Sequence, residues 1–126
     1  MVAIGDDHRF GGRASIEMAE LDREHYCERI YCEFSSYIER LLDERNVRLQ
    51  VVQQSHREDW IQAFVRSNFG VAFMPLSIAD AAGLAHVCTS DCPIVREVKV
   101  LVQAERPVTA AQQAVIDSLA QHAWQK

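Results

Sequence analysis

LQVVQQSHREDWIQAFVRSNFGVAFMP, residues 49–75, changes from a strand pattern to a helix pattern and back. Residues 49–53 form a short apolar run typical of a strand. Residues 55–58 then follow the S-x-x-E capping pattern, which predicts the start of a helix. The helix is expected to bury Trp60, Ile61, Phe64 and Val65. It should end near Asn68, and the apolar run 70–75, stopped by a proline, predicts an inner strand.

Toward the N-terminus the same alternation continues. Residues 2–4 predict a strand, residues 16–21 one or two helical turns, and residues 25–31 a further strand. Residues 34–45 predict an amphipathic helix that ends at Asn46. Its apolar face consists of Phe34, Tyr37, Ile38, Leu41 and Leu42.

Toward the C-terminus the pattern indicates shorter elements. Residues 79–82 predict a turn of helix, residues 84–88 a brief strand, and alternating valines over 98–102 a firmer strand. A second capping pattern at 109–112 predicts a last helix. Its inward face should consist of Val115, Ile116, Leu119 and Ala123. Strands alternate with helices throughout, so we expect an α/β fold in which helices flank a mixed, mostly parallel sheet.

Composition limits the classes of protein to which the chain can belong. It has 126 residues, 48% of them hydrophobic, which suits a single domain over residues 1–126. Its net charge of -5 and the lack of a Lys/Arg cluster argue against direct nucleic-acid binding by this chain. The apolar stretch 69–76 is far shorter than a membrane span, so no membrane partner is expected. Four cysteines without a secretion signal favour a reducing compartment, the cytoplasm.

The order of these pieces resembles the effector-binding domain of LysR-type transcriptional regulators. The resemblance rests on Cys32-Glu33 between strand and helix, on segments 55–62 and 68–75, and on residues 6–13. Asn68 stands where the family often has glycine, a mild departure because asparagine tolerates the left-handed conformation. The resemblance implies a periplasmic-binding-protein-like (type II) lobe over about residues 5–95, and a closing strand and helix over 96–126. The family's winged helix-turn-helix, linker helix and first lobe have no counterpart in this sequence.

The resemblance also implies a binding site for a small organic anion. Effectors in the family bind between lobes, at strand ends and helix N-termini, where amides and the helix dipole favour anions. Carried over, the wall contributed by this chain is Tyr31, Cys32, Glu33, Gln54, Ser55, His56 and Pro75. Ser55 equally fits an ordinary helix cap that needs no ligand, and both interpretations stay open.

Cysteine chemistry offers an alternative function. Cys32 precedes a helix, where a thiolate is stabilised, and resembles the reactive cysteine of peroxide-sensing relatives. Cys27 is the candidate resolving thiol, and a buried, inert Cys32 is the other interpretation. A metal site is not expected, because Cys88-x-x-x-Cys92 lacks the C-x-x-C spacing of zinc knuckles. The residues that could be combined with that pair are Cys27, Cys32, His25 and His86.

No nucleophile elbow, phosphate-binding loop, dinucleotide fingerprint or paired-carboxylate spacing occurs, so neither an enzyme nor a cofactor is expected. The sequence predicts an effector-binding module derived from a LysR-type regulator, without its own DNA-binding domain. A thiol-based redox sensor and a protein-interaction or oligomerisation module are the alternatives. A homodimer is expected, because the apolar face of the last helix must be buried, either on this chain's own sheet or on another subunit.

Overall fold

The computed structural model describes residues 1–92 and 94–123. The chain forms two compact units, Met1–Val95 and Arg96–Lys126. The elements of the first unit are β1 (Val2–Ile4), β2 (Ser15–Ile16), the 3-10 helix η1 (Met18–Leu21), β3 (His25–Arg29), α1 (Ser35–Glu44), β4 (Gln50–Ser55), α2 (Glu58–Arg66), β5 (Ala72–Phe73), α3 (Leu76–Ala81) and β6 (Ala85–Thr89). The second unit contains α4 (Ala110–Gln121).

The strands of the first unit make a mixed arrangement, as predicted. Four of them are ordered β2-β6-β1-β5, and β3 and β4 pair separately. The β3–β4 and β2–β6 pairs are parallel, whereas β1 is antiparallel to both of its neighbours. A parallel bridge between Tyr26 and Val71 links β3 to the residue preceding β5. The pattern is that of an α/β protein.

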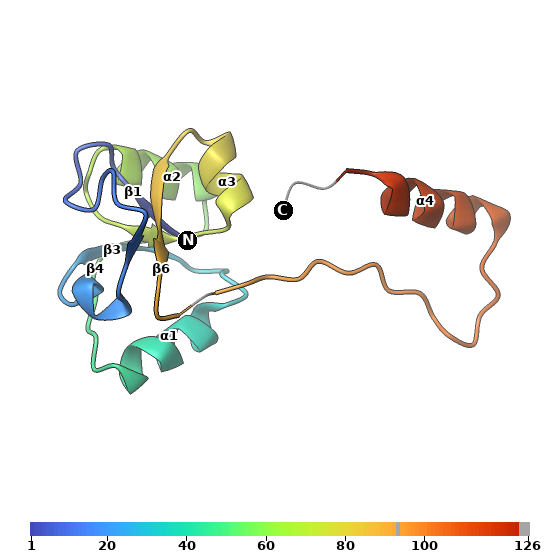
Figure 1. The fold of residues 1–126 in the computed structure, drawn as a ribbon, viewed down its shortest axis with the longest axis horizontal. Coiled ribbons are helices and arrows are strands. Elements are labelled where there is room, and N and C mark those ends of the chain that lie inside the picture. The colour runs from blue at the N-terminus through green and yellow to red at the C-terminus, as the bar shows by residue number, and fades with distance from the viewer. Residues whose placement is uncertain (93, 124–126) are drawn as a thin grey trace. The chain divides into compact units, whose positions relative to one another are not determined.

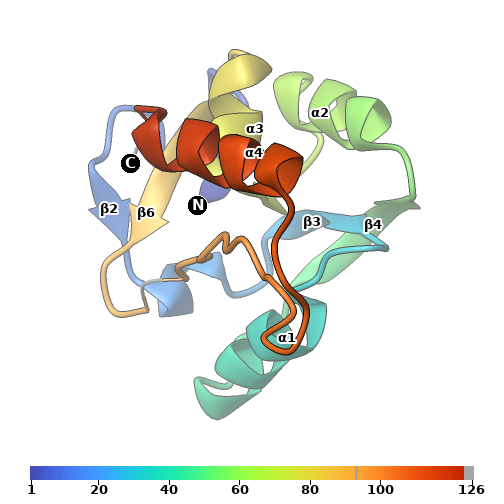
Figure 2. The same ribbon diagram turned by 90° about the vertical axis from the view of Figure 1, so that its right-hand side faces the viewer.

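Helices cover both faces of these strands. In Figures 1 and 2, α1 lies on one side of the strands, and α2 and α3 lie on the other. Strand β1 shows why, because Val2 and Ile4 belong to the core cluster that includes α1, while Ala3 belongs to the cluster that includes α2. The two clusters lie on the two sides of the strands, and in each cluster the apolar face of a helix packs against side chains of the strands.

The helical turn predicted over residues 16–21 is present but shorter, and its first residue belongs to a strand. Ser15 and Ile16 pair with β6 as β2, and only the 3-10 turn η1 follows. Glu17 precedes that turn as its cap, and the carboxylate of Glu20 accepts the Glu17 N–H at 2.9 Å. The apolar residues that suggested a helix, Met18 and Leu21, are fully buried by this short turn.

The predicted cap of α2 is wrong in detail. Ser55 is the last residue of β4, and its hydroxyl accepts the N–H of Arg57 at 2.9 Å. Helix α2 begins at Glu58 with Arg57 at the N-cap. Trp60 was expected to be buried but is 51% exposed, because Ile61 and Val65 take the inward face, while Trp60 contacts the Arg57 guanidinium.

The second unit confirms the last helix and contradicts the strand before it. Thr109 and Gln112 form the predicted capping box of α4. Residues 98–102 form no strand. A strand needs a second segment with which its backbone can form hydrogen bonds, and no described segment of the second unit pairs with these residues. Their side chains stay exposed, Val98 at 82% and Leu101 at 88%. On the expected inward face of α4, Ile116 and Leu119 are half-buried, whereas Val115 and Ala123 are exposed.

Candidate functional site at the ends of β3 and β4

Strands β3 and β4 end together at one edge of their pair. Arg29, the last residue of β3, is in register with Ser55, the last residue of β4. The pairing continues one residue further, because the Ile30 N–H donates to the Ser55 carbonyl at 3.1 Å. The turn after β3 and the end of β4 are therefore neighbours, and six of the seven expected site residues lie in that turn, in the last two positions of β4 or directly after it.

Two of those residues stack on each other. The rings of Tyr31 and His56 lie with centroids 4.6 Å apart and planes tilted by 33°. Tyr31 is 80% exposed, so the pair presents an aromatic surface to solvent. Gln54 points elsewhere, because its amide donates to the Glu28 carboxylate on β3. The structure thus brings Tyr31 and His56 together and commits Gln54 to the neighbouring strand.

A charged pair missed by sequence reasoning lies beside this turn. The Arg29 Nε donates to the Glu58 Oε2 at 2.7 Å, and the Arg29 side chain is only 13% exposed. Its Nη1 lies 3.9 Å from the Cys32 sulfur. The Glu58 Oε1 is buried, and no hydrogen-bond donor of the described residues reaches it. A guanidinium and an acceptor oxygen with unused capacity thus adjoin the turn.

The N-termini of α1 and α2 begin near the same edge. The Ser35 N–H donates to the Cys32 carbonyl at 3.1 Å, and the Cys32 N–H donates to the Arg29 carbonyl at 3.1 Å, so a tight turn leads from β3 into α1. Only two residues separate Ser55 from the first residue of α2. The first N–H groups of each helix lack intrahelical acceptors, and the helix dipoles place partial positive charge there. Hydrogen bonds from the Arg57 guanidinium lower the pKa of Asp59, which favours the ionised form of that first-turn carboxylate.

The remaining expected residues lie apart or have other roles. Pro75 is the N-cap of α3, where its carbonyl accepts the N–H groups of Ile78 and Ala79. Glu33 lies in the turn itself, one residue before the N-cap of α1, Phe34. Ser55 contributes its hydroxyl to the Arg57 N–H, as a local cap of the turn rather than of the helix.

The two candidate redox cysteines pack on opposite sides of the strands. Cys27 is fully buried in the cluster that includes α2, and burial raises the pKa of its thiol to about 11. Cys32 packs against the cluster that includes α1. At neutral pH a thiol with that pKa is almost entirely protonated, so Cys27 is a poor nucleophile. Among the described residues no three His, Cys, Asp or Glu side chains form a group that could hold a metal ion.

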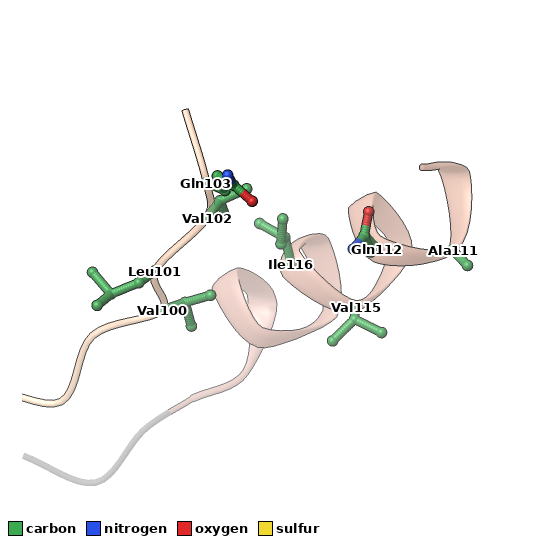
Figure 3. A pocket seen from close by; sticks show the side chains of 8 residues that line it. All are labelled: Val100, Leu101, Val102, Gln103, Ala111, Gln112, Val115 and Ile116. Carbon is green, nitrogen blue, oxygen red and sulfur yellow. The ribbon is translucent and has the colours of Figure 1, made fainter. Parts of the chain in front are cut away.

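The second unit has a hollow of its own, of about 430 Å³, between α4 and the extended segment before it. Figure 3 shows Ile116 pointing from the helix toward the segment that carries Val100 and Val102, while Leu101 points away. Its walls are mostly aliphatic, and its lining side chains include Gln103 and Gln112 but no charged group that could pair with an anion.

Comparison with known proteins assigns the family. Residues 1–124 match the model of the LysR substrate binding domain. The chain belongs to this family. Solved structures similar to the chain include the Synechocystis PCC6803 CcmR regulatory domain in complex with 2-PG, at 16% identity and a TM-score of 0.75 over 94% of this chain. The effector binding domain of QuiR in complex with shikimate matches at 16% identity and a TM-score of 0.70 over 92% of this chain.

These matches define the α/β fold as that of LysR effector-binding domains. A third relative, the C-terminal domain of a probable LysR family regulator from Rhodococcus sp. RHA1, matches at 18% identity and a TM-score of 0.52, over 60% of this chain and 39% of its own. The chain spans 59% of the CcmR domain and 56% of the QuiR domain. No curated protein matches. Among the described residues no helix is long and apolar enough to cross a membrane.

Proposed function

We propose that this LysR substrate-binding chain is a small-molecule effector module of a transcription regulator, and that a small organic anion binds at the turn where β3 and β4 end. The observation that carries the proposal is the start of both α1 and α2 beside the paired strand ends Arg29 and Ser55. Two helix N-termini and a half-buried guanidinium favour an anion at one place. The module acts by binding, without a reaction or a cofactor, in the cytoplasm.

The chemistry of the turn suits a hydroxylated or phosphorylated acid. Backbone amides at the helix starts can hold the acidic group, and the Tyr31–His56 surface can cover the body of the ligand. The Arg29 guanidinium, which is 13% exposed, adds a positive charge beside the turn. The relatives in complex with 2-PG and with shikimate support this class of ligand.

The test uses 2-PG and shikimate as probes in thermal unfolding and calorimetric titration of the full chain. A ligand present at 100 times its Kd should raise the free energy of unfolding by about 2.7 kcal/mol. Replacing Ser55 with alanine removes the hydroxyl that orders the entry into α2, so we expect about tenfold weaker binding of whichever probe binds.

Ser67→Ala is the matched control. The Ser67 hydroxyl donates to the Phe64 carbonyl at 2.9 Å at the opposite end of α2. The Ser67→Ala substitution therefore removes a comparable local hydrogen bond at a place away from the turn. Its affinity for the probe should equal that of the unchanged chain. Equal weakening by both serine variants, or no stabilisation by either probe at millimolar concentration, would contradict the proposal.

We also propose that the chain self-associates through its second unit. Large apolar side chains are exposed along its extended segment and on α4, among them Val98, Val100, Leu101, Val102, Val108 and Val115. A surface of this kind is typical of an interface. A homodimer would bury it.

Sedimentation of the chain and of Leu101→Asp tests this second proposal. The unchanged chain should sediment as a dimer at tens of micromolar, and the aspartate should shift it to monomer, because a charge buried without a partner is costly. Glu97→Asp, a neighbouring change that keeps its charge, should leave the dimer intact. A monomer at millimolar concentration would overturn the proposal.

A further inference from the structure

A hollow of about 350 Å³ in the first unit lies away from the strand-end turn. It is bounded by the loop after β1, by residues 23–25 and by residues 68–70 between α2 and β5. His25 opens β3, whereas Tyr31 follows the other end of that strand. Four residue steps from His25 to Arg29, at about 3.3 Å each, place the two regions about 13 Å apart. The hollow is therefore a separate feature of the fold.

Its lining carries a net positive charge in a chain whose overall charge is -5. Glu24 is engaged on both oxygens, by the Arg9 Nε at 2.5 Å and by the His8 Nε2 at 3.4 Å. Arg23 is different, because its Nε lies 3.7 Å from the Asp22 Oδ2, too far for a hydrogen bond, and its side chain is 83% exposed. Its guanidinium is thus available to an anion.

An apolar surface adjoins that charge. Phe69 is 47% exposed and packs one side against Phe64, with ring centroids 5.5 Å apart. Gly70 beside it is buried against β3, where an added Cβ would lie 2.8 Å from the His25 carbonyl oxygen. The exposed part of the Phe69 ring is therefore the apolar surface that a ligand ring could contact.

Backbone strain is concentrated at the same place. Three described residues other than glycine have a positive φ, and two of them, Arg23 at 63° and Asn68 at 58°, line this hollow. Asparagine tolerates that conformation, whereas an arginine there costs about 1 kcal/mol. In return the Arg23 side chain makes only a long, exposed ion pair with Asp22, at 3.7 Å, which adds little to stability and is consistent with a role outside the fold.

We propose that this hollow binds a small organic anion with an aromatic body, its carboxylate on Arg23 and its ring against Phe69. Charge alone would recruit any anion to an exposed arginine, weakly. The exposed ring selects for acids that also carry an apolar body, so the site should distinguish aryl acids from acetate and from uncharged analogues. The proposal stands independently of effector binding at the strand-end turn.

Amide chemical shifts of the full 15N-labelled chain, titrated with phenylacetate, test the proposal. The amides of residues 23–25 and 68–70 should move with saturable curves. Phenylacetamide, which has the same shape without the charge, and acetate, which has the charge without the ring, should each bind about fivefold or more weakly. Arg23→Asn suits the positive φ and should weaken phenylacetate binding by a similar factor while leaving the fold intact.

Arg40→Gln is the matched charge control, because Arg40 is an exposed arginine on α1 that pairs only loosely with Glu44, at 3.8 Å. Its affinity for phenylacetate should be unchanged. Shifts confined to residues 30–34 and 54–57 would assign the anion to the strand-end turn and overturn this second site. Equal affinity for phenylacetamide, or equal weakening by the two arginine variants, would also overturn it.

Discussion

Replacing Gly70 with alanine is expected to lower the free energy of unfolding by about 3 kcal/mol. The added Cβ would lie 2.8 Å from the His25 carbonyl oxygen and 3.1 Å from the Cys27 sulfur. Neither atom can yield easily. The Val71 N–H donates to that same carbonyl at 2.8 Å, and the Cys27 N–H donates to the Val71 carbonyl at 2.8 Å. Relieving the clash therefore requires β3 to move away from residues 70–71, with which it pairs.

Chemical denaturation of Gly70→Ala and Gly83→Ala measures this effect against a matched control. Gly83 has a φ of +62° and nothing within 4 Å of an added Cβ, so alanine there meets backbone strain without a clash and should cost about 1 kcal/mol. If Gly70→Ala proves no more destabilising than Gly83→Ala, the close packing of β3 against residues 70–71 is not important for stability.

The helices could be predicted from the sequence because the spacing of apolar residues and the capping residues depend only on the segment that forms the helix. Helix spacing predicted α1 over residues 34–45, and a capping pair predicted the start of α4 at residue 109. Helix α4 ends at Gln121, before the expected end at residue 124, which lies outside the described residues. The valines at 98–102 had equally regular spacing but form no strand. A strand needs an edge to pair with, which is a property of the whole fold rather than of the segment.

The candidate site could be predicted only where it follows from strand order. Parallel pairing brings Tyr31 and His56 together, and the family resemblance anticipated that edge. The Arg29–Glu58 ion pair joins residues 29 positions apart, and Glu58 had already been assigned to a helix cap. Local patterns cannot choose between two partners for one carboxylate, so the charged group beside the turn became visible only in three dimensions.

Phe10→Ala is expected to be the most destabilising single truncation, at about 4 kcal/mol. Phe10 lies in a loop without periodicity and was missed by the sequence patterns, yet its side chain is fully buried in the cluster that includes α1. The His8 ring lies 4.9 Å from it, and the Arg9 guanidinium carbon lies 4.1 Å above its ring. Removing the ring leaves a cavity. It also frees the loop after β1, which bounds the hollow that is lined by Arg23 and Phe69.

Phe10→Leu separates those two consequences. Leucine retains most of the buried volume, so thermal unfolding should show a loss below about 1.5 kcal/mol. Its phenylacetate affinity should be close to that of the unchanged chain, because Arg23 and Phe69 are untouched. A Phe10→Ala chain that unfolds at the same temperature as Phe10→Leu would mean that the loop collapses into the cavity, and that His8 and Arg9 are held by Glu24 rather than by packing on Phe10.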